Sequence, residues 1–201
     1  MTDRKRNSYI LLSGKFFLLI FNLYFLFSTA IMSQNLNQNA FISPIIKFQS
    51  ILHQASYTGG ARFGWVINDR YVLGGGFYSS LNSIPTDIID SQKGNKVLLN
   101  FNMGGLEFEY IFIRNKFIKT SLVFFGGSGG LHFSDQPNNS YSKNILVWES
   151  ELHSEIMIER WLRCGIGAGY RFITYTNDSS DPYGININGL FGLFSIKFCT
   201  E

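Results

Sequence analysis

Apolar and polar side chains alternate along several long stretches of this 201-residue chain. Between residues 55 and 67 the odd positions include Tyr57, Phe63, Trp65 and Ile67, whereas the even positions carry polar side chains, glycine or, at 66, valine. The same period of two returns in residues 148–158 and 162–172. Because successive side chains of a strand point to opposite faces, this pattern predicts long amphipathic strands rather than helices.

The connections between these strands alternate between short and long. Tight turns are predicted at 68–70, 114–116 and 160–161, and longer polar loops at 83–95, 134–143 and 176–184. This alternation is typical of outer-membrane barrels, in which short turns face the periplasm and both chain ends lie on that side. Counting back from the C-terminus gives strands at 184–198, 162–175, 144–159, 117–133, 96–112, 71–82 and 55–67. Both chain ends can lie on the periplasmic side only if the number of strands is even, so an eighth strand is required, and residues 41–50 can supply it. We therefore predict an all-β, eight-stranded antiparallel up-and-down transmembrane β-barrel.

Two of the predicted strands change their apolar face part-way along. In 96–112 the apolar positions are odd up to Met103 and even from Leu106, with Gly104 and Gly105 between them. A similar change surrounds the glycines at 126–130. We interpret both changes as glycine bulges, which help a small barrel to close.

The first thirty residues have the features of a secretory signal peptide. Basic side chains precede residue 16, an apolar run fills 16–30, and Ser28 and Ala30 occupy the −3 and −1 positions of a cleavage site. This run is shorter than the roughly 20 residues of a membrane helix. We expect a cleavable signal peptide at 1–30, a linker at 31–40, the barrel at 41–198 and a tail at 199–201. The location expected is the outer membrane of a Gram-negative bacterium.

The composition agrees with a barrel and argues against nucleic-acid binding. Only 15% of residues are charged and 16% are aromatic, which argues against a disordered chain. The net charge of +3 equals the charge of the first thirty residues alone, so the remainder is neutral. Without a basic surplus, we expect no nucleic-acid partner.

If the apolar face meets lipid, the polar face lines the barrel lumen. The predicted lumen charge network comprises Arg62, Glu107, Glu109, Glu149, Glu151, His153, Glu155, Arg163, Arg171 and Lys197, with Lys119 added if the bulge is present. Acids and bases are nearly balanced, which predicts a salt-bridged plug rather than a water-filled pore. The alternate acids around His153 could also form an acid–base or metal site, but charge compensation explains them more simply. We expect no cofactor and no bound metal.

Two segments resemble small outer-membrane β-barrel proteins. They are residues 59–68 (GGARFGWVIN) with 71–78 (YVLGGGFY), and residues 163–172 (RCGIGAGYRF). The chain is therefore similar to OmpA-type eight-stranded barrels, whose members mostly have no assigned activity. The resemblance implies a fold and a location but no reaction. It also implies that Phe198 is the terminal aromatic residue read by the barrel-assembly machinery, although Cys199, Thr200 and Glu201 follow it.

One short motif names a reaction. His132-Phe133-Ser134 resembles the His-x-Ser of outer-membrane lipid A deacylases, which would make Ser134 the nucleophile and His132 its base. Glu149 or Glu151 would then have to orient the histidine. Chance placement is the favoured interpretation, because the match is three residues long.

Three functional hypotheses follow. The main one is a non-enzymatic outer-membrane barrel, monomeric or part of an envelope complex, which contacts outer-membrane lipid and lipopolysaccharide and whose polar loops serve binding or assembly. The alternatives are a lipid A hydrolase and a narrow channel. A soluble barrel is disfavoured, because it would need an apolar interior. Finally, Cys164 and Cys199 should lie at similar depth in neighbouring strands and could form a disulfide, unless they point to opposite faces.

Overall fold

The computed structural model describes residues 40–89, 96–136, 139–175 and 187–200. The predicted signal peptide and nearly all of the linker lie outside the described residues, as does the end of the tail. The strands are β1 (Ala40–Ile51), β2 (Gln54–Ile67), β3 (Tyr71–Ser80), β4 (Ile84–Ile89), β5 (Lys96–Arg114), β6 (Ile118–Gln136), β7 (Asn139–Glu159), β8 (Leu162–Tyr175) and β9 (Gly189–Cys199). No helix in the described residues is long and apolar enough to cross a membrane.

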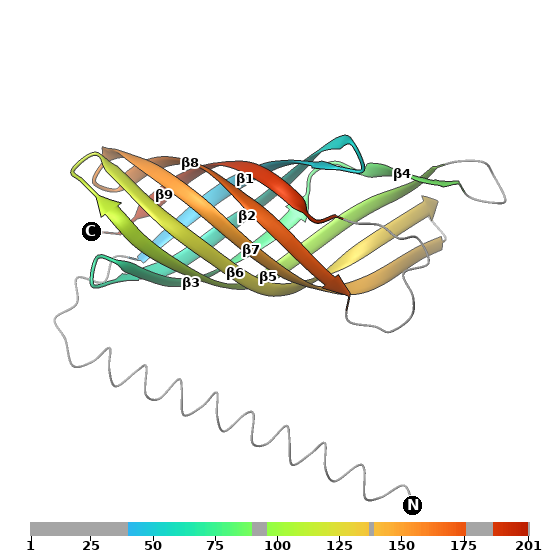
Figure 1. Cartoon of the computed structure of the whole chain (residues 1–201), viewed down its shortest axis with the longest axis horizontal. Helices are drawn as coiled ribbons and strands as arrows, with labels where there is room; N and C mark the ends of the chain where they lie inside the picture. Colours follow the sequence, from blue (N-terminus) through green and yellow to red (C-terminus); the bar gives the residue numbers. More distant parts are fainter. Residues whose placement is uncertain (1–39, 90–95, 137–138, 176–186, 201) are drawn as a thin grey trace, which may run out of the picture. The chain divides into compact units, whose positions relative to one another are not determined.

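Eight of these strands form a closed antiparallel barrel, which confirms the predicted fold class (Figure 1). Apart from β4, each strand pairs with the strands next to it in sequence, and β1 pairs with β9. Closure is completed by β3 and β5, which pair from Tyr71↔Tyr110 to Ser79↔Asn102. The short β4 is not a ninth strand of the barrel wall, because it pairs with β5 beyond the end of β3, at Ile84↔Leu99 and Ile89↔Lys96.

Both described chain ends lie at the same end of the barrel, as the even strand number requires. The amide of Ala40 donates to Oγ1 of Thr200 at 3.0 Å, and the amide of Thr200 donates to the carbonyl oxygen of Ala40 at 2.9 Å. The three predicted tight turns are at this same end. In the turn after β2, Asn68 and Asp69 adopt φ of 50° and 58°, a left-handed conformation that these residue types tolerate in tight hairpins. We call this the terminal end of the barrel, and the other the loop end.

Two loop predictions at the loop end were wrong. Residues 84–89 of the predicted 83–95 loop form β4. The predicted 134–143 loop is mostly paired strand, because β6 and β7 run on to Gln136↔Asn139. The predicted loop 176–184 lies outside the described residues.

The predicted glycine bulges are also absent. The pairing of β5 with β6 continues without a shift through Gly104↔Ser128 and Gly105↔Gly127, and β6 pairs continuously with β7 through 126–130. The shift in β5 lies instead between Ile111 and Ile113. The apolar odd residues of β5 up to Met103 therefore point into the barrel, not out of it. Along β5 the inward side chains change from apolar to charged, while the register of β5 with β6 stays constant across the glycines.

Candidate functional site in the barrel lumen

The outer face of the barrel is apolar and the inner face is charged over the half nearer the terminal end. Trp148 and Ile156 of β7 point outward and are each 57% exposed, whereas Glu151 between them is 4% exposed. Arg171 on the neighbouring β8 is fully buried. This distribution is opposite to that of a soluble protein and fits a barrel surrounded by lipid.

Within this charged half of the lumen, the charges nearest the loop end gather around Glu149. Its carboxylate accepts hydrogen bonds from Nζ of Lys47 on β1 and, at 2.5 Å, from Nε of Arg171 on β8. Arg171 also donates to Oε1 of Gln49 at 2.8 Å. β1 is thereby joined across the lumen to the β7–β8 hairpin, which is distant from it in sequence.

Lys47 was not among the predicted lumen charges, although the alternation along β1 indicates its position. Ser43, Ile45, Lys47 and Gln49 alternate with exposed side chains such as Ile46. The alternation places Lys47 on the inner face, where it is almost fully buried.

Arg62 on β2 occupies the middle of the lumen. Its Nε donates to Oε2 of Glu107 at 2.5 Å, and its Nη1 lies 3.3 Å from Oε1 of Glu151. The hydroxyl of Tyr78 donates to the second oxygen of Glu107, also at 2.5 Å. Tyr78 was another residue that the polarity pattern did not identify, because tyrosine is common on both faces of a barrel strand.

A third group of charges lies nearer the terminal end. Nζ of Lys119 is 2.8 Å from Glu109 and 3.6 Å from Glu155. Lys197 pairs with Glu155 and lies 3.8 Å from Glu109. Nη1 of Arg163 is 3.8 Å from Glu155. Lys119 thus faces the lumen as expected, although the bulge that was expected to place it there is absent.

His153 belongs to this ionic interior. Its Nε2 is 3.0 Å from Oγ of Ser195, and its Nδ1 is 3.6 Å from Glu155. In the described part of the chain no three His, Cys, Asp or Glu side chains are grouped to hold a metal ion. Each of the five lumen carboxylates instead has a lysine or arginine nitrogen within 4 Å.

Toward the loop end the interior becomes apolar, which the sequence analysis did not anticipate. The buried side chains here come mainly from β5, β6 and β7, and include Val97, Leu99, Phe101, Leu131, Phe133, Ile145 and Val147. The few charges at this level lie against aromatic rings: Nζ of Lys143 is 4.2 Å from the ring centre of Tyr175. The lumen therefore has an ionic level near the terminal end and an apolar level near the loop end.

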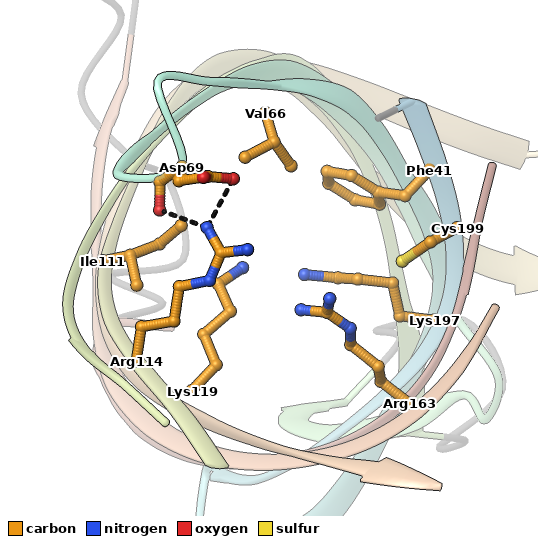
Figure 2. A pocket seen from close by; sticks show the side chains of 9 residues that line it. All are labelled: Phe41, Val66, Asp69, Ile111, Arg114, Lys119, Arg163, Lys197 and Cys199. Carbon is orange, nitrogen blue, oxygen red and sulfur yellow. Dashed lines mark hydrogen bonds and ion pairs between the residues drawn. The ribbon is translucent and has the colours of Figure 1, made fainter. Parts of the chain in front are cut away.

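A small cavity opens at the terminal end, and we call it the mouth (Figure 2). Its free volume is about 20 Å³. Arg114, Lys119, Arg163 and Lys197 point into it from different strands, and Arg114 is paired with Asp69. The remaining lining residues are Phe41, Val66, Ile111 and Cys199.

The residues of the hydrolase hypothesis do not come together. His132 is exposed on the outer face of β6, with its Nε2 3.2 Å from Nδ2 of Asn102. Ser134 shares that face, whereas Glu149 and Glu151 are buried on the inner face. The barrel wall separates the acids from the histidine, so neither carboxylate can orient it.

The cysteines are free, so the suggested disulfide is not formed. Cys164 pairs across the β8–β9 ladder with Ile196, three residues from Cys199. Their positions also alternate to opposite faces, because Cys199 lines the mouth while Cys164 follows the inward-facing Arg163. Similar depth was therefore not sufficient for a bond.

The fold is shared with solved outer-membrane barrels of very different sequence. The N-terminal β-barrel domain of Pseudomonas aeruginosa OprF superposes with a TM-score of 0.56 at 8% identity, over 83% of this chain and 100% of that domain. Neisserial surface protein A gives 0.55 at 10% identity, over 80% of this chain and 96% of the other. Ail, the attachment invasion locus protein of Yersinia pestis, in complex with the heparin analogue sucrose octasulfate, gives 0.51 at 10% identity, over 81% and 99%. No protein-family model matches the sequence, and no curated protein matches it.

Proposed function

We propose that this chain is an integral outer-membrane β-barrel without enzymatic activity, which serves a structural, binding or envelope-assembly role. The observation that carries the proposal is the apolar outer face around a charged interior. Exposed outward residues such as Trp65, Trp148 and Ile156 would be unfavourable in water but are suited to lipid. Export would use the predicted signal peptide, and insertion would use the barrel-assembly machinery, with the exposed Phe198 as the terminal aromatic residue.

Insertion is tested by fractionation and by gel migration. The mature protein should stay with outer membranes after carbonate washing, and unboiled samples should migrate differently from boiled ones because the closed barrel resists detergent. A soluble periplasmic protein expressed in the same cells is the control. Release by carbonate together with identical boiled and unboiled bands would refute membrane integration.

We further propose that the lumen is plugged. Ion pairs between several strands fill the ionic level, and packed aliphatic and aromatic side chains fill the apolar level. An ion crossing the barrel would have to displace both, which argues against the channel hypothesis. Planar bilayers containing the refolded protein should therefore stay silent, and reproducible single-channel steps would refute the plug.

The binding role is assigned to the polar outer surface at the loop end. On β5 and β6 the outward side chains beyond the glycines include Asn100, Asn102, Ser128 and His132. This polarity suits contact with water, lipopolysaccharide headgroups or another envelope protein rather than with acyl chains. Whether the barrel acts alone or in a complex is tested by cross-linking in intact cells, followed by gel analysis.

A further inference from the structure

The charges inside the barrel balance at one level but not at the other. Nearer the loop end, Lys47, Arg62 and Arg171 face three carboxylates, those of Glu107, Glu149 and Glu151. This group is neutral and almost completely buried.

At the mouth, three cations face only two carboxylates. Lys119, Arg163 and Lys197 surround Glu109 and Glu155. Arg62 approaches Glu109 as well, at 3.9 Å, but its charge is already balanced in the group nearer the loop end, by Glu107 and Glu151. Among the described residues that line the mouth itself, the acid is Asp69, and Arg114 already pairs with it. The surplus positive charge of the ion-pair network therefore lies at the opening.

Arg163 carries this surplus most plainly. Its closest carboxylate oxygen is 3.8 Å from Nη1, a looser contact than those of Lys119 or Lys197. Its buried Nε has no hydrogen-bond partner among the described residues. Its side chain is 18% exposed, in contrast to 3% for Lys197, so it can be reached from the mouth. Figure 2 shows Arg163 and Lys197 pointing toward Lys119 across the opening.

We infer that the mouth is an anion-binding site that takes a phosphate group. A guanidinium fork and two ammonium groups that converge on one opening match the oxygens of a phosphate, which accept several charge-assisted hydrogen bonds. The free volume of about 20 Å³ admits one oxygen-sized group, so a phosphate oxygen enters while the rest of the group stays outside.

Two sources can present this chemistry at the terminal end. One is free inorganic phosphate from the surrounding solution. The other is the headgroup of a membrane phospholipid, because Trp161 and Phe117 are exposed at the same end, where aromatic side chains of barrels lie at headgroup depth.

The test follows the Nε–Hε resonance of Arg163 by NMR in the full mature chain, refolded in a phosphate-free detergent. Inorganic phosphate is added, with sodium chloride at matched ionic strength as the control. We expect a saturable shift with phosphate and none with chloride. In Arg163→Gln, phosphate binding is read from the backbone amides of the mouth and should weaken about tenfold or more, as expected for the loss of a charge-assisted contact. Arg160→Gln, in the adjacent exposed turn, should bind like the wild type.

Lipid nanodiscs then distinguish the two sources. If a headgroup fills the mouth, the Arg163 resonance in nanodiscs already lies at its phosphate-bound position and added phosphate does not move it. If free phosphate is the ligand, the titration in nanodiscs repeats that in detergent. A wild-type resonance that does not respond saturably in detergent would overturn the proposal. So would an Arg163→Gln variant that migrates as a folded barrel and binds phosphate unchanged. If that variant does not fold, Arg163→Lys, which keeps the charge but loses the fork, should still bind more weakly, and unchanged binding would again overturn the proposal.

Discussion

Removing the carboxylate of Glu149 should destabilise the barrel strongly, because two cations depend on it. Lys47 and Arg171 both bond to this side chain, and all three are almost fully buried. Glu149→Gln keeps the shape and removes the charge. After the change the nearest acid to Lys47 is Glu151 at 3.9 Å, while Arg171 retains its bond to the neutral Gln49.

The expected loss can be bounded from known ion pairs. Removing one partner of a buried pair typically costs about 3–5 kcal/mol, since an uncompensated charge stays in a medium of low dielectric constant. Glu149→Gln should therefore lower the free energy of unfolding by about 3–5 kcal/mol. Glu159→Gln, at an exposed position of the same strand, is the matched control and should change it by about 0.5 kcal/mol or less.

The assay is urea-driven unfolding in phospholipid vesicles, followed by tryptophan fluorescence. Trp65, Trp148 and Trp161 all lie on the outer surface and should report loss of the lipid environment. Adding Lys47→Met to Glu149→Gln removes one uncompensated cation. The double variant should therefore lose less free energy of unfolding than the two single variants together, by about 0.5–3 kcal/mol. A cost below about 1 kcal/mol for Glu149→Gln, with additive behaviour of the pair, would contradict a dry ion-paired lumen.

Three further predictions test other parts of the structure. Leu152→Arg places a cation on the outer apolar face and should cost about 2–4 kcal/mol in vesicle unfolding, whereas Ser142→Arg, near the loop end of the same strand, should cost about 0–1 kcal/mol; equal costs would contradict a lipid band at Leu152. In Gly165→Ala the new Cβ would lie 2.5 Å from Nε2 of His153, so overpacking should lower the free energy of unfolding by about 1–3 kcal/mol. Gly189→Ala is the control, because its Cβ would meet no atom within 4 Å, and it should not lower the free energy of unfolding by that amount. Thiol titration of the denatured, unreduced protein should find both cysteines free, and an intramolecular cross-link on a non-reducing gel would contradict the separated faces.

Strand positions could be predicted from the sequence where the same face of a strand stays apolar along most of its length. The expected 55–67 and 162–175 strands match β2 and β8 closely, because apolar side chains alternate with polar or small ones along most of both. Turn-forming residues misled the interpretation at the loop end. The segment 134–143 contains Pro137 and several asparagines and serines, and these were read as a loop although the strands pair almost to the tip.

The charged lumen could be predicted because a buried charge on a strand needs a partner across the barrel. The pattern alone did not show which acid meets which base, since barrel closure brings together strands such as β1 and β7 that are distant in sequence. Lys47 is the only charged residue between 40 and 51, on the strand that was assigned from the even strand count rather than from an alternating pattern, so the face of its side chain was not predicted. The suggested catalytic group failed for a related reason: the His132–Ser134 motif does not show on which side of the barrel wall the acids of the next strand lie.

The absence of the predicted glycine bulges explains how β5 can face lipid along one part of its length and water along another. On β5, Leu106 and Phe108 point outward while Glu107 and Glu109 point inward, as a strand in lipid requires. Toward the loop end of the same strand, Leu99 is fully buried inside and the outward positions 100 and 102 are asparagines, as in a barrel surrounded by water. Because a register shift would have kept apolar side chains outward at both levels, the constant register requires the strand itself to change its apolar face. Gly104 and Gly105 lie where that change occurs, so neither face presents a side chain there. On β5 we therefore place the outer limit of the lipid-facing apolar surface near these glycines, and the apolar interior beyond them is stabilised by burial in its own core rather than by the membrane.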